Sequence, residues 1–75
     1  MKINLSGLTA EILQTESIEY TDTKDVNTLL KVLQAKSRIL SSAKLYVTIN
    51  EELAEERQTF KESDEVFVFN PFPGG

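Results

Sequence analysis

Apolar and polar residues alternate at the start of the chain. In residues 2–7, Ile3 and Leu5 are separated by polar side chains, which is the pattern of a strand with one buried face. The run ESIEYT repeats this alternation with Ile18 and Tyr20 and predicts a second strand that pairs with the first. The segment 8–14 between the two strands has the length of a short helical turn.

The apolar period lengthens at residue 26 and becomes that of a helix. Residues at positions i, i+3, i+4 and i+7 form one stripe: Val26, Leu29, Leu30 and Leu33. This stripe predicts the main helix over residues 26–36, with Thr23 or Asp25 as the cap at its start. The stripe fades after Leu33, so we expect the helix to end near Ser37 and a polar loop to follow.

Two more strands are predicted in the second half of the chain. The strongest signal is KLYVTIN, in which aliphatic residues at 45, 47 and 49 share one face. Its expected partner is EVFVFN, which is apolar on both faces. One interpretation buries both faces of EVFVFN in the core. The other places Val66 and Val68 against the helix and leaves Phe67, Phe69 and Tyr46 on the open face of the sheet, where they bind a partner.

A charged segment separates these two strands. We expect one short strand around Leu53 to Arg57 and a turn over residues 62–64. The segment carries four closely spaced glutamates: Glu51, Glu52, Glu55 and Glu56. They are typical of a solvated loop, and the alternative is that they steer the protein toward a basic rim on its partner.

Two strands, a helix and further strands predict an α+β domain. In this domain a mixed sheet of four to five strands curls around one main helix, which is the ubiquitin-like β-grasp plan. We assign residues 1–69 to the domain and residues 70–75 to an extended C-terminal tail. The prolines of NPFPGG lack the donor that a sheet ladder needs, so the chain leaves the sheet there. A tail of this length reaches on the order of 20 Å when extended.

The composition removes several classes of function. The 75 residues suit one domain, and the absence of cysteine and histidine excludes a disulfide, a zinc site and Ser-His or Cys-His nucleophiles. A net charge of −4 disfavours nucleic acid and favours an electropositive protein partner. The apolar runs are too short for a membrane span and the N-terminus lacks a secretory signal, so we expect no membrane association and a cytoplasmic location.

The last two residues, Gly74 and Gly75, carry no side chains. An enzyme that threads a carboxylate through a narrow channel to a nucleotide phosphate needs such a terminus. Joining the Gly75 carboxylate to AMP supplies a leaving group that sulfur or an amine can displace. Because the chain has no phosphate-binding glycine loop, we expect a separate activating enzyme to bind and consume the ATP. No cofactor is expected on this chain.

The order of elements, together with DEVFVFNPFPGG at the C-terminus, resembles the small subunit of molybdopterin synthase within the ubiquitin-like sulfur carriers. The resemblance covers essentially the whole chain, and its specific part is the last dozen residues. The matching positions are Asp64, Glu65, Val66, Phe69, Pro71, Gly74 and Gly75. The family usually has a glycine where Ser63 stands, a paired proline at Asn70-Pro71, and a small residue in place of Pro73.

The resemblance implies a non-catalytic carrier subunit with two partners. An ubiquitin-activating-like adenylyltransferase activates the Gly75 carboxylate, and a persulfide sulfur replaces AMP. The resulting thiocarboxylate enters the large catalytic subunit of molybdopterin synthase and supplies sulfur to a cyclic pterin precursor. The expected partner-binding residues are Phe67, Phe69, Pro71, Phe72 and Tyr46.

Other functions stay open at the level of the sequence. The same tail chemistry serves sulfur carriers for thiamine or tRNA thiolation and ubiquitin-like protein modifiers. A function of a different class is a β-grasp module that binds its partner through the phenylalanine face without covalent chemistry.

Overall fold

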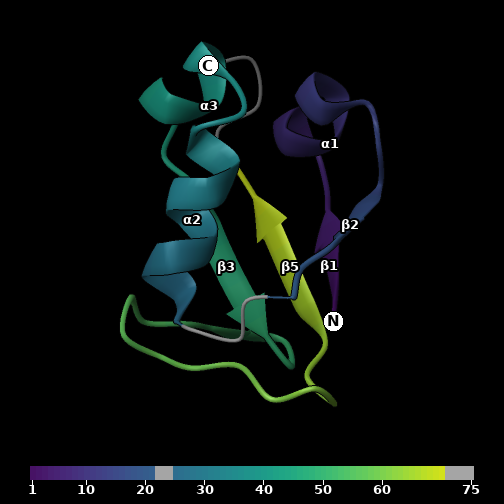
Figure 1. Cartoon of the computed structure of the whole chain (residues 1–75), viewed down its shortest axis with the longest axis vertical. Helices are drawn as coiled ribbons and strands as arrows, with labels where there is room; N and C mark the ends of the chain where they lie inside the picture. The colour runs from purple at the N-terminus through teal and green to yellow at the C-terminus, as the bar shows by residue number, and fades with distance from the viewer. Residues whose placement is uncertain (22–24, 71–75) are drawn as a thin grey trace.

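The computed structural model describes residues 1–21 and 25–70, which form a mixed five-stranded sheet with the main helix packed across one face (Figure 1). The elements in chain order are β1 (Lys2–Leu5), α1 (Leu8–Leu13), β2 (Ser17–Glu19), α2 (Val26–Gln34), α3 (Arg38–Ser42), β3 (Tyr46–Ile49), β4 (Glu52–Leu53) and β5 (Val66–Phe69). The short helices α1 and α3 lie at the end of the sheet toward which β5 points (Figure 1).

The last strand of the chain occupies the centre of the sheet, whose strand order is β2-β1-β5-β3-β4. On one side β5 runs parallel to β1, with Ile3 opposite Val66. On the other side it runs antiparallel to β3, with Val47 opposite Val68. This topology is the ubiquitin-like β-grasp fold, which confirms the fold class predicted from the sequence.

Three strands are shorter than the sequence predicts. β1 ends at Leu5 instead of residue 7, because Gly7 takes a positive φ of 59° and starts α1. β2 ends at Glu19, although the Tyr20 amide still donates to the Met1 carbonyl oxygen at 2.8 Å. The strand expected over residues 53–57 is wrong in its position, since β4 contains only residues 52–53.

The main helix begins at a carboxylate cap. Asp25 Oδ1 accepts hydrogen bonds from the Thr28 amide at 2.9 Å and from the Thr28 hydroxyl at 2.8 Å. These two bonds hold the pKa of Asp25 below its usual range, and the bond from the Thr28 backbone amide has the larger effect. Of the two predicted caps, Asp25 is therefore confirmed, and Thr23 lies outside the described residues.

The polar loop expected after Ser37 is wrong, because a second helix, α3, follows α2 closely. Ser37 caps it, with its Oγ accepting a hydrogen bond from the Ile39 amide at 3.1 Å. Leu40 is fully buried and ties the helix to the core. A helix of five residues shows barely more than one turn of apolar period, so the pattern alone does not reveal it.

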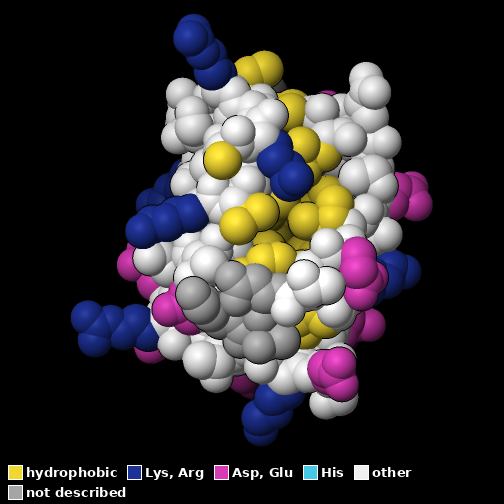
Figure 2. Space-filling view, viewed as in Figure 1, with side chains coloured by type: hydrophobic (Ala, Val, Ile, Leu, Met, Phe, Trp, Pro, Cys, Tyr) yellow, Lys and Arg dark blue, Asp and Glu magenta, His cyan; other side chains and the backbone are white. Residues whose placement is uncertain are grey.

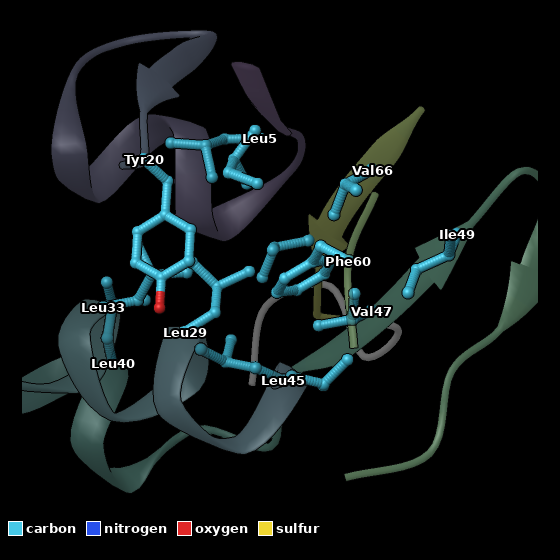
Figure 3. Close-up of a cluster of buried hydrophobic side chains, with 13 residues drawn as sticks. Leu5, Tyr20, Leu29, Leu33, Leu40, Leu45, Val47, Ile49, Phe60 and Val66 are labelled. Carbon is cyan, nitrogen blue, oxygen red and sulfur yellow. The ribbon is translucent and has the colours of Figure 1, made fainter. Parts of the chain in front are cut away.

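The core lies between α2 and the inner face of the sheet. It contains the predicted helix stripe residues Leu29 and Leu33 and the inward residues of the strands. The loop residue Phe60 was not predicted to belong to it, yet its ring packs edge-on against Tyr20 with centroids 6.2 Å apart (Figure 3). Figure 2 shows that hydrophobic side chains also reach the surface along a band on the α2 side of the molecule.

Candidate functional site

The two faces of β5 differ in their environment. Val66 and Val68 are fully buried, whereas Phe67 is 38% exposed and Phe69 is half-buried. This alternation agrees with the interpretation that places the valines against the helix and the phenylalanines on the open face of the sheet. The alternative that buries both faces is wrong for Phe67, because α2 covers only one side of the sheet (Figure 1).

The predicted aromatic residues come together on this open face. Tyr46 on β3 lies opposite Phe69, and their rings meet edge-on with centroids 6.0 Å apart. The Lys44 ammonium lies 5.6 Å from the centroid of the Tyr46 ring, within the range of a cation–π interaction. Phe67 lies two residues before Phe69, at the next position on the same face of β5, opposite Asn4 on β1 and Thr48 on β3. We call Tyr46, Phe67 and Phe69 the aromatic face.

The face ends where the tail begins. Asn70 follows β5 directly and is the last described residue, so the predicted site residues Pro71, Phe72, Gly74 and Gly75 lie outside the described part of the chain. Asn70 also lines a surface groove of about 530 Å³ that the sequence did not predict. Its apolar floor comes from α1 and α3, and the basic residues Arg38 and Lys44 stand at its rim.

The sequence model of the ThiS family matches residues 3–75, which is nearly the whole chain and includes the tail. The chain belongs to the ThiS family. This family comprises ubiquitin-fold sulfur carriers and modifiers, as the resemblance of the C-terminal residues suggested. No curated protein sequence matches the chain.

Solved structures of two proteins share the fold of this ThiS-family chain. One is a putative molybdopterin converting factor subunit 1 from Pyrococcus furiosus, with 14% identity, a TM-score of 0.75 and 95% of each chain covered. The other is small archaeal modifier protein 1 from Haloferax volcanii, with 21% identity, a TM-score of 0.73 and coverage of 96% of this chain and 97% of that one. A further structure of that modifier has 23% identity and a TM-score of 0.73, covering 100% of this chain and 98% of that one.

Side-chain hydrogen bonds of Asp64 and Asn50 hold the turn before β5 in this member of the ThiS family. Asp64 Oδ2 accepts from the Lys61 amide at 2.8 Å, and Asp64 Oδ1 accepts from the Asn50 side-chain amide at 3.0 Å. Asn50 Oδ1 in turn accepts from the Glu65 amide at 2.9 Å. Ser63, which stands where the resembling family usually has glycine, has no positive φ, so the backbone here does not require glycine. The turn predicted over residues 62–64 is confirmed.

The four glutamates of the charged segment are all exposed, as the loop interpretation predicts. Their suggested role in steering remains a prediction. Across residues 1–21 and 25–70, no three acidic side chains gather closely enough to hold a metal ion. None of the helices within these ranges has the length and apolar character needed to cross a membrane.

Proposed function

We propose that this chain is the sulfur carrier subunit of molybdopterin synthase, with the Gly75 carboxylate as the carrying group. The observation that carries the proposal is the family match through residue 75, which joins the aromatic face and the Gly-Gly tail in one ThiS-family unit. The tail starts at the end of the central strand, so a partner that holds the aromatic face receives the tail at a fixed point.

The chemistry takes place on enzymes that bind this chain. A Gly75 carboxylate oxygen attacks the α-phosphate of ATP on the activating enzyme, and pyrophosphate leaves. A persulfide sulfur then attacks the carbonyl carbon and expels AMP, giving an acyl disulfide. A thiol cleaves the S–S bond, which releases the thiocarboxylate and leaves a disulfide behind. The thiocarboxylate then enters the large catalytic subunit and transfers its sulfur to a cyclic pterin precursor.

The partner must release the carrier after each transfer. The dithiolene of the product contains two sulfurs, so two charged carriers are consumed for each product. An interface that relies on a small aromatic face suits such turnover, because a few partly exposed anchors give specificity without the large buried area of a permanent complex.

The experiment that tests the proposal is the intact mass of the protein after incubation with ATP, an activating enzyme and a sulfur donor from the same cell. We expect a rise equal to the replacement of one oxygen by sulfur, and no rise in a variant that lacks Gly75. No rise with an activating enzyme that charges another carrier would refute the carrier function and favour the noncovalent binding module.

The acceptor is decided by a second step. Adding the large subunit and the cyclic pterin precursor should consume the thiocarboxylate and yield the dithiolene product. The structural likeness to small archaeal modifier protein 1 supports a modifier as the second candidate. That function predicts covalent conjugates between Gly75 and lysine side chains of other proteins, while carriers for thiamine or tRNA thiolation would leave the pterin precursor unchanged.

The aromatic face is tested separately from the tail. Phe69→Ala should weaken binding to the large subunit by about tenfold or more, because it removes a half-buried anchor that also supports Tyr46. Leu53→Ala is the control, since Leu53 is exposed on the edge strand β4. Unchanged binding of Phe69→Ala would remove Phe69 from the interface.

A further inference from the structure

The groove beside the tail is made by the helix that the sequence pattern did not reveal. Because α3 turns Leu40 fully into the core, the neighbouring residue Ile39 faces outward and is 60% exposed. Ile39, Leu8 and Ala43 line the groove, and Asn70 closes it at the start of the tail. An opening of about 530 Å³ with an aliphatic floor is large enough to take one or two apolar side chains.

The charge at this groove is opposite to that of the whole protein. The chain has a net charge of −4, yet among residues 1–21 and 25–70 the charged residues that line the groove are Arg38 and Lys44, and none of the lining residues in these ranges is acidic. Arg38 makes no ion pair with any described residue, and Lys44 is directed over the Tyr46 ring. Two cations without carboxylate partners at the rim of an apolar groove are complementary to an acidic segment that carries an apolar side chain.

The groove is also continuous with the aromatic face. Lys44 belongs to the groove rim and contacts Tyr46, and Tyr46 contacts Phe69. Asn70 links the groove to the tail itself. A protein that holds both the aromatic face and the tail therefore passes directly along the groove.

We propose that this groove binds an acidic segment with one aliphatic or aromatic side chain, contributed by a protein that takes the tail. The apolar side chain fills the space over Ile39 and Ala43, and its flanking carboxylates pair with Arg38 and Lys44. That the partner is a protein which takes the tail rests on the proposed function. The preference of the groove for an acidic segment with an apolar side chain rests only on its lining residues. This contact gives the partner a selectivity that the Gly-Gly end cannot give, because a carrier with an acidic residue at position 38 or 44 would repel the same segment.

The first test titrates the isotope-labelled full chain with the peptide acetyl-Glu-Glu-Leu-Glu-Glu-amide and follows the amide resonances. We expect saturable shifts centred on Ile39, Ala43 and Lys44, with a Kd of about 1 mM or tighter. Peptides with serine in place of leucine, or lysine in place of glutamate, should not bind. Equal shifts with all three peptides, or shifts centred elsewhere, would overturn the proposal.

Two other occupants give distinct results in the same experiment. If the peptide binds only after residues 71–75 are removed, the tail of the same chain fills the groove and the proposal is wrong. If sedimentation shows that the chain self-associates and that Ile39→Ser abolishes this association, the occupant is a second copy of the chain, and the proposal is again wrong.

A second test uses two reactions, which are charging of the carrier by the activating enzyme and sulfur transfer on the large subunit. Arg38→Glu and Ile39→Ser should each raise the KM for the carrier on at least one of the two tail-binding proteins by about fivefold or more, with kcat little changed. The control Lys61→Glu makes the same charge change at an exposed residue in the segment before β5, which does not line the groove, and should leave KM within about twofold. If wild type is charged and both groove variants keep the wild-type KM on the activating enzyme and on the large subunit, the groove proposal is wrong and the carrier function stands. An absence of charging in wild type refutes the carrier function, and the peptide titration still decides the groove.

Discussion

The turn between β3 and β4 leads to a prediction about the direction of a stability change. Asn50 and Glu51 have φ values of 53° and 72°, and Ile49 pairs directly with Glu52 across them. This is a two-residue hairpin loop with both central residues in the left-handed region, for which Asn-Gly is the preferred pair. Asn50 suits its position, but Glu51 has a Cβ atom where glycine is favoured.

Replacing Glu51 with glycine should therefore stabilise the protein. The left-handed conformation costs an L-residue about 1–2 kcal/mol, and glycine avoids that cost. Glycine also gives the unfolded chain more freedom, which offsets about 0.4–1 kcal/mol of the gain. The net gain in the free energy of unfolding is about 0.5–1 kcal/mol, which for a domain of this size raises Tm by roughly 2–8 °C.

The assay is urea unfolding followed by circular dichroism, with Tm from calorimetry. Glu51→Ala is the matched control, because it removes the same carboxylate but keeps the Cβ atom. If the gain came from relieving repulsion among the neighbouring glutamates, alanine would stabilise as much as glycine does. Equal stability of the two variants, or a less stable glycine variant, would refute the argument from backbone strain.

Three further predictions follow from the packing and the caps. Thr9→Val should raise the free energy of unfolding by about 1–2 kcal/mol in urea unfolding, because the fully buried Thr9 hydroxyl has no hydrogen-bond partner among the described residues; a loss of stability would contradict this. Leu33→Ala should cost about 2–5 kcal/mol by the same assay, whereas Leu53→Ala, at a residue 68% exposed, should change stability by no more than about 0.5 kcal/mol. Because the folded-state pKa of Asp25 is lowered, its stabilising contribution is present above the unfolded-state pKa and is lost as pH falls through the folded-state value. Asp25→Asn should therefore be less stable than wild type at pH 7, and the difference should shrink in unfolding curves measured below about pH 4; a constant difference would rule out the charge of the cap as its cause.

The features of the fold whose hydrophobic pattern extends over several residues could be predicted from the sequence. The helix stripe ending at Leu33 and the alternation through β5 each extend over several residues, and each buried face is visible in the pattern. The sequence allows two interpretations of Val66 and Phe67, because an apolar strand has no polar residue that marks its solvent face. The structure separates them because, in the described part of the chain, helices cover only one face of the sheet.

The features that could not be predicted depend on one or two residues. The helix α3 rests on the Ser37 cap and a single buried leucine, which is too short a signal for a period. Phe60 enters the core from a loop, where no period exists. The β3–β4 turn lacks the glycine that marks such turns, so the sequence predicts the short strand too far along the chain. The groove was missed for the same reason as α3, because Ile39 lines it only when that helix is present.

The position of β5 connects the stability of the domain to the delivery of its end. β5 pairs with β1 through residues of the N-terminus and with β3 through the strand that carries Tyr46, so both of its edges are held in the sheet. Its valines are buried beneath α2, and its phenylalanines face outward. Under the proposed function, a partner that pulls on the tail pulls on a strand that is paired along both of its edges, so the domain can present its end without losing its fold. An edge strand such as β4 would peel away under the same load, which is a physical reason for a carrier of this fold to end on its central strand.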